Sequence, residues 1–196
     1  MATIKKFTIQ QGETWQRVIR WEIPPIIYKA ITAITQAAPA VITSPTHGLV
    51  SGWRAALVSV NGMTEINSLH VVPRDSDYHQ VTVLDANTVS MNTVNSAGYS
   101  PYTSGGYLQF MTPQDLTGYT AHMDIKDKIG GTVLLSLTTV NGGIIISPGN
   151  KTITLFLTDV ATEAITWLNA VYDLDLISPS SVVTPLYTGT IEFIKE

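Results

Sequence analysis

Alternation of apolar and polar positions is clearest in the last third of the chain. In YTAHMDIK, residues 119–126, every second residue is apolar, and VYDLDLI, residues 171–177, shows a similar alternation. Successive side chains of a strand point to opposite faces, so a period of two predicts strands that are buried on one face. The residues expected inside are Tyr119, Ala121, Met123, Ile125, Tyr172, Leu174 and Leu176.

Further strands are predicted around these two. Gly130 and Gly131 predict a hairpin turn in KDKIGGTVLLSL, and NGGIIIS with PGNKTITLFL predicts a second hairpin. The segment FTIQQGETWQRVIRW predicts two short strands near the start, and a last strand is expected at 189–193. One helix of about ten residues is expected in DVATEAITWL, with Thr158 or Asp159 as its N-cap and its apolar stripe against one end of a sheet.

The middle of the chain has a different pattern, with short apolar pieces separated by turn residues. NGMTE, PRDSD, DAN and NSAG read as turns by composition. Several short strands at this spacing are typical of a small barrel or sandwich. The strands expected here are at 31–34, 41–43, 55–60, 69–72, 80–84 and 88–92.

The two patterns together predict an interrupted domain. Residues 1–27 supply too few strands for a core, whereas residues 111–196 supply most of a sandwich. We therefore expect an all-β fold: an antiparallel β-sandwich with one short helix, called the body (1–27 and 111–196), interrupted by a small inserted β-barrel, called the guest (28–110). An insertion of this kind costs little when the ends of the guest lie close together.

Composition supports this fold and excludes some partners. Only 13% of the 196 residues are charged, and abundant β-branched residues favour strands. The net charge of -4 gives no basic surface for nucleic acid, and no apolar run reaches the length of about 18 residues that a membrane span needs. The chain has no cysteine, so disulfides, thiolate nucleophiles and cysteine metal sites are absent. We expect a soluble protein with neither nucleic acid nor membrane as a partner.

Particular segments carry a resemblance to known families. FTIQQGETW, DLTGYTAHMDIKDKIGGTVL, ITLFLTDVATEAI and AVYDLDLISPSSVVTPLYTGTIEF resemble bacteriophage tail and baseplate proteins, similar to the N-terminal domain of upper baseplate proteins. ITAITQAAPAVITSPTHGLVSGWRAALVSVNGMTEIN, VLDANTVSM and YTSGG resemble the first catalytic cysteine half-domain of ubiquitin-activating enzymes. Without cysteine the guest cannot form a thioester, so it is expected to act by shape and contact.

The resemblance implies a role in a virus particle. The chain is then a structural virion protein of a phage tail, baseplate or neck, made in the host cytoplasm, whose partners are copies of itself in a symmetric ring and other virion proteins. TIKKFTIQ and GTIEFIKE at the two ends are candidates for strand addition to a neighbour. The alternative is that both strands pair only within their own sandwich.

The side chains that have catalytic or metal-binding chemistry occur in patterns typical of ordinary surface roles. The histidines lack metal-type spacing, and His47 in PTHGL is expected to make a local hydrogen bond. DSDYH places Asp75, Asp77 and His79 at alternate positions, and Asp173 with Asp175 shares one strand face, but exposed polar surface explains both. No nucleophile elbow, phosphate loop or dinucleotide fingerprint is present. We expect no enzyme activity, cofactor or metal.

Tyrosines in or beside turns of the guest form the candidate contact surface. Such rings offer a large apolar area at little entropic cost, which suits protein partners and sugars. The alternative is that they pack at the rim of the core. A second functional hypothesis follows, in which the guest is a carbohydrate-binding module that contacts host cell-surface glycan. The residues concerned are Tyr78, Tyr99, Tyr102 and Tyr107.

Overall fold

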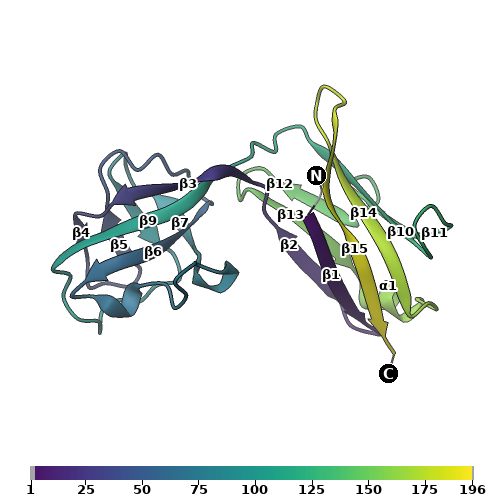
Figure 1. Cartoon of the computed structure of the whole chain (residues 1–196), viewed down its shortest axis with the longest axis horizontal. Helices are drawn as coiled ribbons and strands as arrows, with labels where there is room; N and C mark the ends of the chain where they lie inside the picture. The colour runs from purple at the N-terminus through teal and green to yellow at the C-terminus, as the bar shows by residue number, and fades with distance from the viewer. Residues whose placement is uncertain (1–2, 196) are drawn as a thin grey trace. The chain divides into compact units, whose positions relative to one another are not determined.

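The computed structural model describes residues 3–195 and shows an all-β protein. Strands account for 51% of the chain and helix for 6%, which confirms the predicted fold class. The chain divides into two compact units (Figure 1): one contains the residues up to Trp21 and from Asp115 onward, and the other runs from Glu22 to Gln114. The first unit is the body and the second is the guest.

The boundaries of the guest lie outside the predicted 28–110. Strand β3 (Glu22–Ala30) pairs with β9 (Ser104–Pro113) in an antiparallel ladder that starts at Glu22 opposite Pro113. The sequence predicted that the strand pattern of the first body segment stops at the two prolines, Pro24 and Pro25. The ladder instead skips them with a register shift between Ile23 and Ile27, because proline has no N–H to donate.

The body is a sandwich of two sheets. The five-stranded sheet has the order β1-β15-β14-β10-β11, and the three-stranded sheet has the order β12-β13-β2. Both predicted hairpins are present, as β10–β11 and β12–β13. The strands are β1 (Thr3–Gln10), β2 (Trp15–Ile19), β10 (Thr120–Lys126), β11 (Val133–Thr138), β12 (Ile144–Ser147), β13 (Thr152–Leu157), β14 (Asn169–Ile177) and β15 (Val183–Ile194).

One core fills the space between these sheets. Trp15, Ile153 and Leu155 face it from the small sheet, and Met123 and Tyr172 face it from the large sheet. The period of two is confirmed in β10 and β14, where every second residue is buried and its neighbours are not. The alternation arises because each strand covers the core with one face only.

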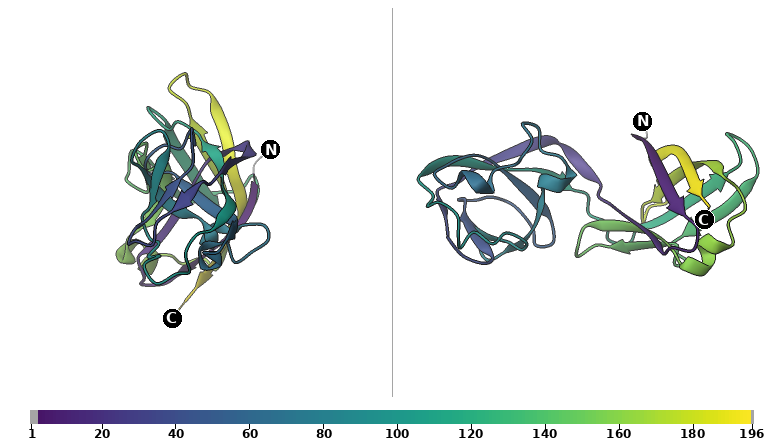
Figure 2. Two further views of the ribbon diagram at one scale, coloured as in Figure 1. Left: turned by 90° about the vertical axis from the view of Figure 1, so that its left-hand side faces the viewer. Right: turned by 90° about the horizontal axis from the view of Figure 1, so that it is seen from below.

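The first and last strands of the body lie side by side (Figures 1 and 2). Strand β1 pairs with β15 in parallel over its whole length, from Thr3 opposite Tyr187 to Gln10 opposite Ile194, whereas every other described pair is antiparallel. Strand β15 also pairs with β14, so it has neighbours on both sides. It is longer than the predicted 189–193.

The single α-helix found in residues 3–195 is shorter than predicted. Helix α1 (Asp159–Glu163) has five residues instead of about ten. Its N-cap is Thr158, whose side chain accepts a hydrogen bond from the backbone N–H of Ala161 at 3.1 Å, as one of the two predicted caps. The expected apolar stripe continues to Leu168, but Leu168 lies beyond the helix and is 54% exposed.

The guest is a barrel that closes through a single bent segment. Strand β3 ends at Ala30 and β4 begins at Ala33; Ile31 N–H bonds to Gly106 O, and Thr32 N–H bonds to Thr43 O. The segment therefore changes its partner from β9 to β5, which joins the two ends of the order β3-β9-β6-β7-β8-β5-β4. Figure 2 shows these strands curving around the interior. The remaining strands are β4 (Ala33–Ile34), β5 (Ala40–Thr43), β6 (Arg54–Asn61), β7 (His79–Val83) and β8 (Thr88–Met91).

The guest has its own core, centred on Trp53, whose indole N–H donates to Met111 O at 2.6 Å.

One predicted strand, at 69–72, is wrong. Those residues form a series of bends, and Leu69, Val71 and Val72 are 91%, 102% and 74% exposed. The apolar composition of the segment suggested a strand, but no neighbouring strand pairs with it in the described chain.

Candidate functional site

The four predicted tyrosines lie in two different environments. Tyr99 and Tyr102 are half-buried against the core of the guest. The Tyr102 hydroxyl lies 3.0 Å from Ile31 O, at the point where the barrel closes, so its role is structural. Tyr78 and Tyr107 lie on the outer side of the barrel, so the four residues do not form one contact surface.

The outer side of β3, β9 and β6 carries a tyrosine that sequence reasoning missed. Tyr28 and Tyr107 are 54% and 45% exposed, and their rings meet edge to face with centroids 6.2 Å apart. Tyr28 lies opposite Gln109 in the β3–β9 register, and the Gln109 amide donates to the Tyr78 hydroxyl at 3.3 Å. We call Tyr28, Tyr78, Tyr107 and Gln109 the tyrosine face. The only signal for Tyr28 was its place after PPII, where no strand was expected.

An ion-pair cluster borders the tyrosine face. Arg54 Nε is 2.7 Å from Glu22 Oε1, its Nη1 is 3.0 Å from Asp75 Oδ1, and its guanidinium lies 4.5 Å from the centroid of the Tyr78 ring. Burial opposes the charge of Arg54, but the hydrogen bonds and charges of Glu22 and Asp75 outweigh it and raise the Arg54 pKa. Burial also raises the pKa of Tyr78. The cluster fixes Arg54 and Tyr78 in place.

The three candidate metal ligands of DSDYH do not lie together in the structure. Asp75 and Asp77 are in a 3-10 helix, so they do not alternate as they would in a strand. Asp75 bonds to Arg54, Asp77 bonds to His70, and His79 Nδ1 lies 2.9 Å from the Thr93 hydroxyl. No group of three or more histidine, cysteine or acidic side chains in the described residues has the geometry of a metal site.

Asp77 anchors the segment before it. Its Oδ2 accepts from Arg74 N–H at 2.9 Å and lies 2.8 Å from His70 Nδ1. The carboxylate is nearly buried, with 2% of its side chain exposed. The Arg74 N–H bond, opposed by burial and helped by the His70 bond, lowers the pKa of Asp77 to about 2.

His47 makes the predicted local hydrogen bond. Its Nδ1 accepts from Leu49 N–H at 2.9 Å, and its Nε2 lies 3.0 Å from Asp85 O. Because a carbonyl only accepts, Nε2 carries the proton. His47 is 2% exposed, and both ring nitrogens are used to hold the turn against the barrel.

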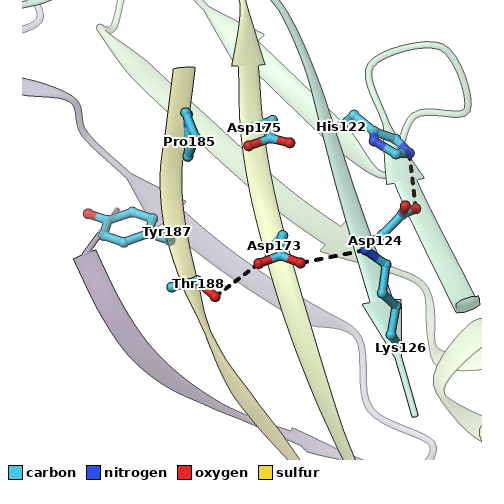
Figure 3. Close-up of a pocket in the computed structure, with 8 residues that line it drawn as sticks. All are labelled: His122, Asp124, Lys126, Asp173, Asp175, Pro185, Tyr187 and Thr188. Carbon is cyan, nitrogen blue, oxygen red and sulfur yellow. Dashed lines mark hydrogen bonds and ion pairs between the residues drawn. The ribbon is translucent and has the colours of Figure 1, made fainter. Parts of the chain in front are cut away.

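The outer face of the five-stranded sheet is charged (Figure 3). A shallow pocket of about 270 Å³ contains His122, Asp124, Lys126, Asp173 and Asp175. His122 Nε2 is 3.0 Å from Asp124 Oδ1, and Lys126 Nζ is 3.5 Å from Asp173 Oδ2. Asp124 also accepts from the Ser136 hydroxyl at 2.6 Å, and Asp173 accepts from Thr188 at 3.0 Å. Neighbouring side chains therefore satisfy the Asp124 and Asp173 carboxylates across the sheet, as in a solvated charged surface.

The outer face of the three-stranded sheet differs, because it carries apolar side chains among polar ones such as Gln16 and Thr154. Val18, Thr154 and Ile145 are direct partners across β2, β13 and β12, so they form one row on this face. Val18 is 48% and Ile145 is 52% exposed, and the partly buried Phe156 lies two residues after Thr154 in the same strand. We call Val18, Ile145, Thr154 and Phe156 the apolar row.

The two terminal strands differ in what they offer a neighbour. Strand β15 is paired on both sides, so the part of GTIEFIKE from Gly189 to Ile194 has no free edge for strand addition, contrary to that hypothesis, and Glu196 lies outside the described residues. Strand β1 is at the edge of its sheet. Thr8 O on β1 already accepts from the Trp15 indole at 2.8 Å, which leaves the segment from Thr3 to Lys6 as the accessible part of this edge.

Comparison with protein-family models and with curated proteins gives no match to this chain. Within residues 3–195, no helix has the length and apolar character needed to cross a membrane.

Proposed function

We propose that this chain is a structural protein of a phage tail, baseplate or neck, which works by protein–protein assembly in a symmetric ring and has no enzyme activity. The family resemblance of the segments described above supports this role. The structural observation that carries it is the contrast between the two outer faces of the body: one sheet presents charges and the other presents the apolar row.

The contrast supports docking through the small sheet. A half-exposed strand normally places polar residues outward, as β10 and β14 do. The small sheet instead places Val18 and Ile145 outward, each directly opposite Thr154 on the strand between them. Apolar side chains gathered on an exposed face mark an interaction site, because burying them against a partner removes them from water.

Purified particles of the phage that encodes the chain provide the test. We expect mass spectrometry to find the chain in the particles and electron cryomicroscopy to find it in a copy number divisible by three or six. Ile145→Lys should reduce incorporation, whereas Asp175→Asn on the charged face should not. Particles that lack the chain, while infected cells contain it, would refute the proposal.

A second function, glycan binding, is favoured by one observation, the exposed pair Tyr28 and Tyr107. Aromatic rings at a surface beside polar groups can stack on sugar rings. The test is affinity of the isolated protein for host polysaccharide and its loss in Tyr107→Ala, with Tyr102→Phe as the control because Tyr102 faces the barrel interior. Absence of measurable affinity would exclude this second function.

A further inference from the structure

The guest presents three apolar side chains almost completely to solvent. Leu69, Val71 and Val72 are 91%, 102% and 74% exposed and lie within four consecutive positions. Isolated exposed apolar residues are common on protein surfaces, but a contiguous group marks an interaction site. We call residues 68–73 the finger.

The finger is fixed at both ends. At its start, Ser68 N–H donates to Leu57 O at 2.7 Å, and the Ser68 hydroxyl donates to His70 O at 2.8 Å. At its end, Asp77 Oδ2 contacts both His70 Nδ1 at 2.8 Å and Arg74 N–H at 2.9 Å. These bonds reduce the entropy that a partner loses on binding the finger, because both ends of the loop are already held.

The same unit contains an apolar pocket that shares no residue with the finger. It has a volume of about 220 Å³ and is lined by residues of β3, of the end of β9 and of the turn at 47–50. Trp53 and Phe110 are almost fully buried and form its inner wall, whereas Val50 is 43% exposed at its rim. The apolar lining consists of Ile27, Leu49, Val50, Trp53, Phe110 and Pro113.

We propose that the finger of one copy inserts into this pocket of a second copy. This inference rests on the proposed function and names the contact between copies. Finger and pocket do not overlap, so each copy can insert its finger into the pocket of one neighbour and bind the finger of another neighbour in its own pocket. Such a head-to-tail contact forms a closed ring when the rotation that relates one copy to the next divides a full turn evenly.

The chemistry of the two parts is matched. Residues 68–73, SLHVVP, contain no lysine, arginine or carboxylate, and His70 is engaged by Asp77. Lys29 is the one lysine, arginine or acidic residue among those lining the pocket. Insertion therefore buries apolar surface on both sides, and Lys29 is the one charged group of the lining whose amine has to stay in contact with water.

Sedimentation velocity of the full chain over a range of concentrations tests the contact. We expect self-association of the natural chain and a loss of affinity of about a hundredfold when Leu69, Val71 and Val72 are all changed to serine. The matched control changes Ile129 and Val140 to serine, because these body residues are 91% and 94% exposed but lie outside the finger. This control should associate as the natural chain does.

Complementation tests the head-to-tail geometry. Val50→Arg blocks the pocket and leaves the finger intact, so this variant and the finger variant should each be monomeric. Their mixture should give a one-to-one dimer, since one supplies the only working finger and the other the only working pocket. Dimer formation also shows that both variants are folded.

Three results would overturn the proposal: a monomeric natural chain at the highest concentration, association unchanged in the finger variant, or a mixture without dimers. None of these results bears on the proposed function, because the presence of the chain in purified particles is measured separately. If the natural chain is monomeric but the finger variant is lost from particles, the finger binds another virion protein and not a second copy.

Discussion

The Tyr172 hydroxyl donates a hydrogen bond to the carbonyl oxygen of Lys5 at 2.9 Å, although the two residues are 167 positions apart. Tyr172 is on β14 and Lys5 is on β1, with β15 between these strands. Gly189 makes the contact possible, because it lies opposite Tyr172 on one side and opposite Lys5 on the other. This hydrogen bond ties the edge strand to the interior of the sheet.

Gly189→Ala should destabilise the body strongly. A Cβ atom at this position would collide with the Lys5 carbonyl, and the backbone of β1 would have to move away. We expect the free energy of unfolding to fall by about 2–4 kcal/mol, measured by urea denaturation. The control is Gly149→Ala, where a Cβ meets nothing within 4 Å. Equal stability of the two variants would contradict the close approach of β1.

Tyr172→Phe isolates the contribution of the hydrogen bond. The ring would keep its stacking on Phe7, whose centroid is 5.0 Å away, while the hydroxyl is lost. We expect the free energy of unfolding to fall by about 1 kcal/mol, less than for the Gly189 variant. Thermal and urea denaturation both measure this change, and a variant as stable as the natural protein would show that the bond contributes nothing net.

Asp77 should make the stability of the guest depend on acid pH. Its pKa is about 2 in the folded protein against 3.8 for an unperturbed aspartate, so the folded state favours the charged form. The stabilisation is therefore complete above the unfolded pKa and is lost as the pH falls through the folded pKa. Asp77→Asn should lower the melting temperature at pH 5–7, and the difference from the natural protein should shrink between about pH 4 and pH 2. A difference that stays constant over this range would contradict the ionic role.

Removal of the guest should leave a folded body. Glu22 and Pro113 are cross-strand partners, so the two ends of the guest are about 5 Å apart. A chain that joins Trp21 to Asp115 through a glycine-serine linker of about four residues should therefore unfold cooperatively, with the circular dichroism of a β protein. The excised guest should also unfold cooperatively. A body without a cooperative transition would show that it depends on the guest for its fold.

Local pattern was sufficient for the strands that cover a core with one face. Met123 and Ile125 in β10 and Tyr172 and Leu174 in β14 are buried as their period of two predicts. The same reasoning failed for Leu69 and its neighbours, because apolar composition alone does not say whether a partner strand is available. It also failed for β3, because its two prolines lie in a register shift that depends on β9.

Contacts between distant segments could not be predicted from the sequence. The tyrosine face depends on Tyr28 and Tyr107 meeting through the β3–β9 pair, and the apolar row depends on Val18 and Ile145 sharing the partner Thr154. A strand pattern gives the face of each residue but not the register between strands. The parallel pairing of β1 with β15 could not be predicted for the same reason.

Because the guest is inserted within the sequence of the body, the two units become complete at different times during translation. The guest is continuous from Glu22 to Gln114, so translation completes it while β1 and β2 still lack β15 and β13. It can fold as soon as it emerges, whereas β1 must wait for the last strand to be synthesised. Nascent chains stalled before β15 would thus carry a mature guest and an unfinished body.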